Sequence, residues 1–152
     1  MNTPQSIFGQ LLEQVAGSAF RAAGYQLQEN TMHQSRGLFR FRKDLAEGIS
    51  VYVEFQLLHY QQGGPSRFRV NLLRSSGPDA RAGIPGYERV ETTLSQLLWE
   101  DFGVERLGSP DHWWLFNAPQ QLAQALAEAG QYVLAFGMPW LERTLDQPPP
   151  ED

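Results

Sequence analysis

The first apolar residues of the chain recur at helical spacing. Between Ile7 and Phe20 they fall at intervals of three and four residues, and Gly24 ends the pattern. Thr3 followed by Pro4 is a typical helix start, because proline is tolerated in the first turn, where its missing N–H is not needed. The spacing therefore predicts an amphipathic helix near the amino terminus.

Strict alternation of apolar and polar residues follows in three segments, 37–43, 49–60 and 67–76. A period of two is that of a half-buried strand, and the short connections between the segments contain the glycines and proline of hairpin loops. We therefore expect an antiparallel meander, led by a weaker strand over 25–34.

The second half of the chain returns to helical spacing. Residues 76–89 are dense in glycine and proline and predict a long loop. Thr93 then opens a short helix with capping-box spacing, and Asn117 opens a second helix in a similar way. Gly137 and Pro139 are expected to break that second helix.

These elements predict an α+β fold in which an antiparallel meander sheet of four to five strands is packed on one face by the N-terminal helix and the C-terminal helices. The length of 152 residues suits one domain, which we assign to residues 1–146. Residues 147–152 are polar and rich in proline, and we expect them to form a disordered tail.

Alternation divides the predicted meander into two faces. The side expected to face the helices carries Phe39, Phe41, Val51, Val53, Phe55, Leu57, Phe68, Val70 and Leu72. The opposite side carries Arg40, Arg42, Tyr52, Glu54, Gln56, Arg67, Arg69 and Asn71.

Two tryptophans stand side by side in the segment 110–117, PDHWWLFN, which we interpret as a further strand. Because successive side chains of a strand point to opposite faces, the two indoles cannot share one environment. We expect Trp114 in the core and Trp113 on, or at the margin of, the arginine side.

The candidate binding residues are those of the arginine side that offer a cation or an aromatic ring: Arg40, Arg42, Tyr52, Arg67, Arg69 and Trp113. Exposed tryptophan, tyrosine and arginine are frequent in binding hot spots, and an aromatic ring among arginines can stack acidic or cationic groups. This pattern favours a non-catalytic module that binds an acidic protein surface or a small anionic ligand. The alternative is a solvated sheet face whose arginines are neutralised by Glu54.

Composition narrows the chemistry. The chain has no cysteine, which excludes disulfides and thiolate chemistry, and a formal net charge of −5, which disfavours nucleic acid as a partner. Neither a signal peptide nor an apolar stretch of membrane-spanning length is present, so we expect a cytoplasmic protein without membrane contact. Oligomeric state does not follow from the sequence.

No cofactor or metal is expected. The chain contains no P-loop, dinucleotide fingerprint or nucleophile elbow, and its three histidines, His33, His59 and His112, are far apart in sequence. An enzyme remains the second hypothesis, as a small hydrolase that pairs His112 with Asp111 or Glu54.

The order of several short segments resembles an uncharacterised bacterial family, domain of unknown function 4304. These segments are AAGY, LFRFRK, VEFQ, FRVNLL, YERVETTL, DHWW and GMPWLER, and the likeness covers residues 7–143. The resemblance implies a small bacterial cytosolic α+β protein with an accessory or immunity-type binding role, and it implies no catalytic residues.

Overall fold

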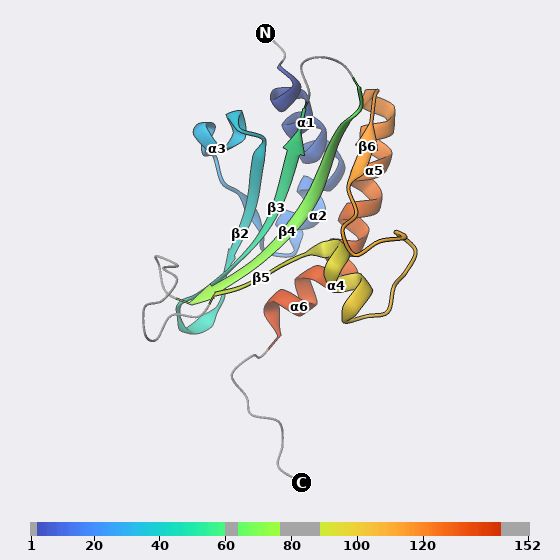
Figure 1. The fold of residues 1–152 in the computed structure, drawn as a ribbon. Helices are drawn as coiled ribbons and strands as arrows, with labels where there is room; N and C mark the ends of the chain where they lie inside the picture. The colour runs from blue at the N-terminus through green and yellow to red at the C-terminus, as the bar shows by residue number, and fades with distance from the viewer. Residues whose placement is uncertain (1–2, 60–63, 77–88, 144–152) are drawn as a thin grey trace.

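A six-stranded antiparallel sheet with helices on one face forms the protein in a computed structural model, which describes residues 3–59, 64–76 and 89–143 (Figure 1). The strands are β1 (Gln26–Leu27), β2 (Leu38–Asp44), β3 (Ile49–Leu58), β4 (Ser66–Ser76), β5 (Arg89–Thr93) and β6 (Trp114–Phe116). Five of them follow in the order β1-β2-β3-β4-β5, and β6 also pairs with β4. The predicted α+β class and meander are confirmed.

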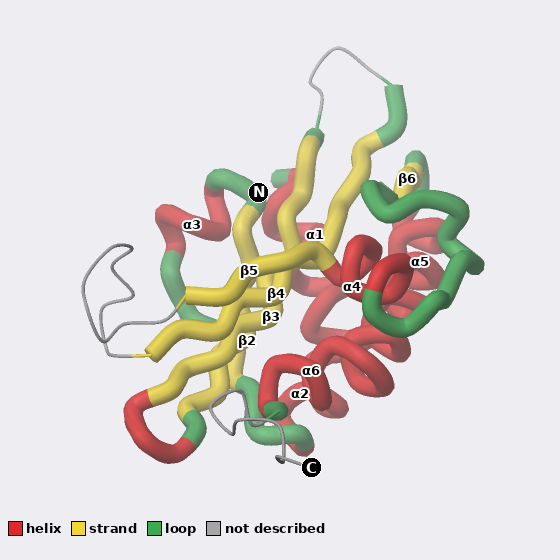
Figure 2. Tube along the Cα trace, turned by 60° about the horizontal axis from the view of Figure 1, so that its bottom comes forward, coloured by secondary structure: helices red, strands yellow, loops and turns green. Residues whose placement is uncertain are grey.

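Most of the helices lie together on one side of the sheet, whereas α3 (Thr31–Ser35) lies beside β2 (Figures 1 and 2). The other helices are α1 (Pro4–Leu12), α2 (Ser18–Ala22), α4 (Leu94–Glu100), α5 (Pro119–Tyr132) and α6 (Met138–Glu142), with a short 3₁₀ turn, η2, over Ala46–Gly48. Two π-helical turns, η1 (Glu13–Gly17) and η3 (Val133–Gly137), join α1 to α2 and α5 to α6. None of the helices in the described ranges combines the length and apolar character needed to cross a membrane.

The core lies between the sheet and these helices. All nine apolar residues assigned to the helix side of the sheet are buried, with exposed fractions of 4% or less. Phe20 of α2 packs edge-on against Phe41, and Phe8 of α1 packs against Phe39 and Phe68. The register of the three long strands is therefore the predicted one, because a slip of one residue would have exchanged the faces.

The N-terminal helix begins as predicted. The side-chain oxygen of Thr3 accepts a hydrogen bond from the main-chain N–H of Ser6, and Pro4 occupies the first turn. Helical geometry continues through η1 and α2 until Gly24, whose φ of 96° suits glycine.

The C-terminal helix does not break at Gly137 and Pro139, so that prediction is wrong. The backbone stays helical through η3 into α6. A proline cannot donate a main-chain hydrogen bond, and its ring crowds the carbonyl four residues earlier, here that of Ala135. Ala135 lies within the wider π turn, where the hydrogen-bond register shifts by one residue, and this shift accommodates the proline.

Two further local predictions need correction. The expected strand over 25–34 is limited to β1, since the Asn30 side chain accepts a hydrogen bond from the N–H of His33 and opens helix α3. Helix α5 is capped at Ala118 rather than Asn117, whose N–H instead donates to the side chain of Gln121.

Strand β5 was not predicted; it begins at Arg89, the last residue of the expected loop, and continues to Thr93. It pairs antiparallel with residues 71–75 of β4, and its Thr93 then caps α4 by accepting from the N–H of Gln96, as predicted. Residues 77–88 of that loop and the expected tail 147–152 lie outside the described residues.

Polar side chains fasten the end of α6 to the sheet. Glu142 accepts hydrogen bonds from Lys43 of β2, at 2.7 Å, and from the phenol of Tyr25, at 3.0 Å. Burial and the nearby Glu142 carboxylate raise the pKa of Tyr25 far above its ordinary value of 10.0. Arg74, buried on the core side of β4, donates to the carbonyls of Leu141 and Arg143.

Candidate binding face

Strand β6 places the two tryptophans on opposite faces. Its pairing with β4 sets Trp114 opposite Phe68 and Leu115 opposite Arg67. Trp114 is 6% exposed, and its ring stacks on Phe68 with the ring centres 5.3 Å apart. Trp113 therefore lies on the other side of the sheet, as predicted.

The Trp113 indole packs against two arginines of β4. The guanidinium carbons of Arg69 and Arg67 lie 4.8 and 5.3 Å from the ring centre. These are cation–π distances, and all three side chains are partly exposed. We call Arg67, Arg69 and Trp113 the Arg–Trp cluster.

The other end of the same face is organised by ion pairs. Arg40 donates to Glu54, directly across from it on β3, at 2.5 Å. Arg42 donates to Asp44 at 2.8 Å and lies over the ring of Tyr52.

Hydrogen bonding sets the charge state of the Arg42–Asp44 pair. The hydrogen bond to Asp44 raises the pKa of Arg42. Hydrogen bonds from Ser50 and Arg42 lower the pKa of the Asp44 carboxyl, so both groups stay ionised near neutral pH.

Amide side chains connect the two ends of the face. Asn71 donates to both Glu54 and Gln56, and Arg69 donates to Gln56 at 3.0 Å. A shallow hollow of about 400 Å³ lies along this chain of contacts, bordered by Arg40 and Arg69. The six predicted residues thus share one face but fall into two groups, one paired with acids and one stacked on an indole.

The groups of the hydrolase hypothesis do not converge. The His112 ring packs edge-on against Trp114 at 4.6 Å, and Asp111 points toward Arg69, with 4.0 Å between Oδ1 and Nη1. Glu54 is engaged by Arg40 and Asn71. Burial lowers the pKa of His112, while Glu128 and a hydrogen bond to the main chain of Leu107 act in the opposite direction.

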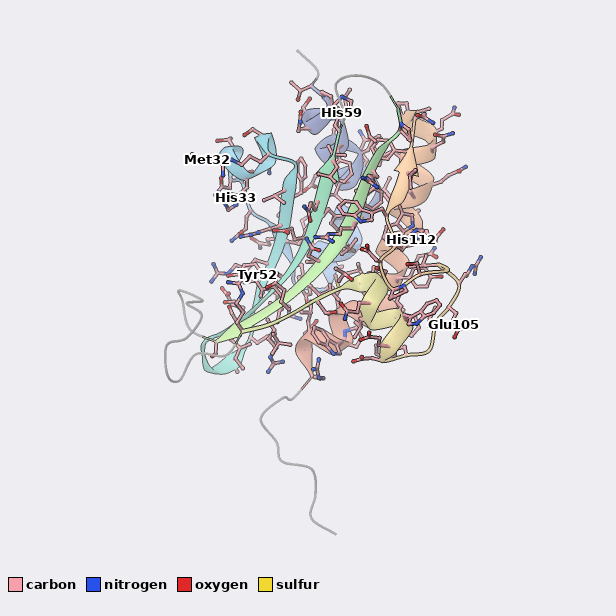
Figure 3. The ribbon with its side chains drawn as sticks, viewed as in Figure 1. Met32, His33, Tyr52, His59, Glu105 and His112 are labelled. Carbon is pink, nitrogen blue, oxygen red and sulfur yellow. The ribbon has the colours of Figure 1, made fainter. Side chains whose placement is uncertain are left out.

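The three histidines lie on separate parts of the fold (Figure 3). His33 belongs to α3, His59 follows β3 and His112 precedes β6. Within the ranges that the structure describes, no three His, Asp or Glu side chains are placed to hold one metal ion.

Leu115 belongs to this face and was left out of the candidate residues. It is 59% exposed and lies directly across from Arg67. The same alternation that separated the tryptophans could have found it, because Leu115 follows Trp113 by two residues.

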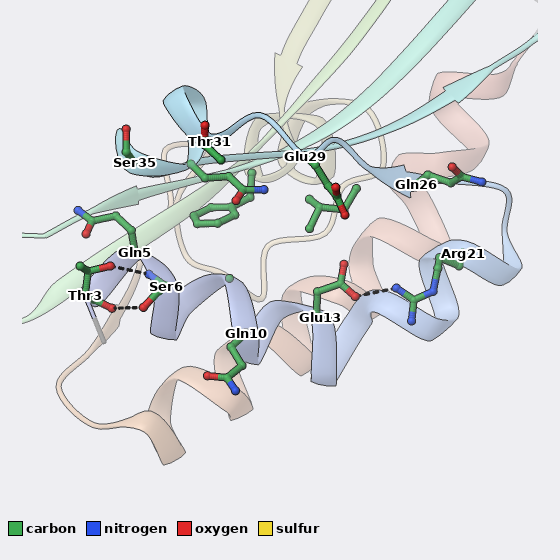
Figure 4. A pocket seen from close by; sticks show the side chains of 14 residues that line it. Thr3, Gln5, Ser6, Gln10, Glu13, Arg21, Gln26, Glu29, Thr31 and Ser35 are labelled. Carbon is green, nitrogen blue, oxygen red and sulfur yellow. Dashed lines mark hydrogen bonds and ion pairs between the residues drawn. The ribbon is translucent and has the colours of Figure 1, made fainter. Parts of the chain in front are cut away.

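A second feature that the sequence did not predict is a groove of about 860 Å³ (Figure 4). One bank is α1 and η1, with Gln10 and Glu13, and the other is the segment from β1 to α3, with Glu29. Leu27 and Phe39 supply its apolar floor. Its banks are far apart in sequence, so no local pattern marks it.

Together these features define a helix-backed antiparallel sheet with an open face of arginine and tryptophan. Comparisons with models of protein families, with curated proteins and with solved structures give no match. The resemblance to domain of unknown function 4304 therefore stays a prediction.

Proposed function

We propose that this protein is a non-catalytic binding module whose Arg–Trp cluster, together with Leu115, binds an acidic surface of a partner protein. The observation that carries the proposal is the Trp113 indole packed against the guanidinium groups of Arg67 and Arg69 on an open face. An accessory or immunity-type role in the cytoplasm, which the resemblance to domain of unknown function 4304 implies, belongs to the same proposal.

The chemistry of the cluster fits carboxylates. A guanidinium that stacks on an indole keeps its charge and directs its N–H donors along the plane of the group. Carboxylates accept such donors two at a time, and Leu115 adds apolar area beside them. Tryptophan and arginine with apolar neighbours are the usual composition of an interface hot spot.

A protein surface suits this face better than a small anion. The hollow beside the cluster is shallow, and its charged lining residues, Arg40, Arg69, Glu54 and Glu91, balance one another. Small ligands are normally held in deep pockets that enclose most of their surface. An open, mixed face of this kind is typical of protein interfaces.

Poly-L-glutamate can stand in for an acidic protein surface, and citrate for a small anion. Binding of poly-L-glutamate is measured by titration calorimetry, with NMR of the indole N–H of Trp113 as the local probe. Trp113→Ala and Arg69→Ala should each weaken binding by roughly thirtyfold or more, which corresponds to the hot-spot scale of about 2 kcal/mol.

Arg106→Ala is the matched control, since it removes one positive charge from an exposed arginine in the loop between α4 and β6. It should change the affinity by less than about twofold. Equal losses in Arg69→Ala and Arg106→Ala, with no loss in Trp113→Ala, would show that only net charge matters and would contradict the proposal. Tighter binding of citrate than of poly-L-glutamate would also contradict it.

A further inference from the structure

The groove between α1 and the β1–α3 segment has the architecture of a slot for an extended chain. Its helical bank runs from Thr3 to Arg21, which is roughly 27 Å at 1.5 Å per residue. A strand of about eight residues has that length. The opposite bank contains β1, the outermost strand of this edge of the sheet.

The pairing of β1 shows which of its main-chain groups point outward. Gln26 and Leu27 lie opposite Arg42 and Phe41, and the N–H of Gln28 donates to the carbonyl of Arg40. In an antiparallel ladder, alternate residues direct both main-chain groups toward the neighbouring strand. Gln26 and Gln28 therefore face β2.

Leu27, by the same alternation, directs its N–H and C=O groups away from β2. The ladder ends at Gln28, whose carbonyl accepts a hydrogen bond from the Gln34 side chain. Leu27 and Glu29 both line the groove. Leu27 offers an extended chain the main-chain donor and acceptor of an unpaired sheet edge, which is the basis of strand addition, and Glu29 offers its carboxylate.

The charged side chains of the groove favour a basic occupant. Glu29 and Glu13 point toward each other across it, and Glu13 is paired with Arg21 at 2.6 Å (Figure 4). With two carboxylates and one guanidinium, these three groups carry a formal net charge of −1. The apolar floor of Leu27 and Phe39 lies below the same edge.

We infer that this groove binds an extended peptide segment of a partner protein, which adds as a strand to the outer edge of β1 and presents a basic side chain to Glu29. An apolar side chain of the segment lies over Leu27 and Phe39. This site is on a different edge of the sheet from the Arg–Trp cluster, and it takes a peptide of the opposite charge.

The test is selection of a displayed library of random eight-residue peptides against the purified protein. Enriched peptides should carry a lysine or arginine next to alternating apolar residues. The most enriched sequence is then synthesised with blocked ends, and its binding is followed by amide NMR. The signals of Leu27 and Glu29 should shift, and their amide hydrogens should exchange more slowly.

Three variants separate charge from strand pairing. Glu29→Gln removes the carboxylate and should weaken the peptide by roughly fivefold or more. Leu27→Pro removes the outward main-chain N–H of β1 and should also weaken the peptide. Glu105→Gln, a charge-matched change in the loop between α4 and β6, should leave the affinity unchanged.

A second measurement does not depend on how the proline variant folds. Methylation of alternate backbone nitrogens of the synthetic peptide leaves its side chains in place but prevents pairing with an edge strand. Such a peptide should lose at least about tenfold in affinity for the unmodified protein.

Several results would overturn the inference: no enriched peptide, equal binding by the methylated peptide, or affinity unchanged in Glu29→Gln and Leu27→Pro. Acidic peptides that lose binding in Arg69→Ala would also overturn it, while supporting the Arg–Trp cluster. Basic peptides unaffected by Arg69→Ala would support the groove whatever the fate of the proposed function.

Discussion

The two ends of strand β4 use arginine in opposite ways. Near β6, Arg67 and Arg69 lie on the open face and stack on Trp113. Near β5, Arg74 lies on the core face, 5% exposed, and donates to carbonyls at the end of α6. The same residue type is a surface group at one end of the strand and a structural one at the other.

The difference follows from what a guanidinium requires when water is removed. A buried charge must have fixed acceptors, and the end of a helix supplies carbonyls that lack partners within the helix. Arg74 therefore receives fixed acceptors from the carbonyls of Leu141 and Arg143, and these carbonyls receive a donor. On the open face the guanidinium of Arg69 donates to Gln56 and stacks on Trp113, and the partly exposed arginine side chains keep their charge within reach of a partner.

The part of the open face around β2 and β3 shows a third arrangement. Arg40 is held by Glu54, which also accepts a hydrogen bond from Asn71. This is the neutralised sheet face that the sequence offered as an alternative, and it applies to the half of the face around β2 and β3. In our proposal, the Arg–Trp cluster at β6 is the half of the face where a partner meets guanidinium groups stacked on an indole.

The largest expected effect tests the orientation of β6. Trp114→Ala removes a buried indole stacked on Phe68 and should lower the free energy of unfolding by about 3 to 5 kcal/mol. Trp113→Ala should lower it by less than about 1 kcal/mol, because that ring is partly exposed. Urea denaturation of both variants measures the difference, and similar losses would mean that the two indoles are equally enclosed.

Most of the correct predictions came from the alternation of apolar and polar residues along the strands. It assigned residues such as Phe55 to the core and separated Trp113 from Trp114, because a period of two fixes the face of every residue in a strand. It could not identify Arg74, since an arginine at an apolar position reveals its burial only when the end of α6 is in place. It missed the groove because Gln10 and Glu29 meet only through tertiary packing.

The next effect concerns the buried arginine. Arg74→Ala leaves the carbonyls of Leu141 and Arg143 without their charged donor and should lower the free energy of unfolding by about 2 to 3 kcal/mol. Arg69→Ala, on the same strand but the open face, should lower it by about 0.5 kcal/mol or less. Chemical denaturation distinguishes them, and an Arg74→Ala protein as stable as Arg69→Ala would remove the contrast between the two ends of β4.

A smaller effect is expected for the ion pair between Arg40 of β2 and Glu54 of β3. Glu54→Gln keeps the shape of the side chain but removes the charge that holds Arg40, and should lower stability by about 1 kcal/mol. It also frees Arg40 from its partner, so poly-L-glutamate should bind this variant more tightly. Unchanged or weaker binding would show that the charge of Arg40 does not reach the partner.

The smallest effect is a dependence on pH that arises beside the Arg–Trp cluster. Burial lowers the pKa of His112 below its ordinary value of 6.5 in the folded protein, so the unfolded chain binds a proton more readily. The contribution of His112 to stability is therefore fully present above pH 6.5 and declines as the pH falls from 6.5 through the folded-state pKa.

His112→Asn removes this titration, and the difference in unfolding free energy between the native protein and this variant should narrow as the pH is lowered from 7.5 to about 5. Denaturation of both proteins at each pH cancels the titration of the carboxylates they share. A difference that stays constant would mean that His112 keeps its ordinary pKa and that its ring, packed on Trp114, is more open to water than the contact of 4.6 Å indicates.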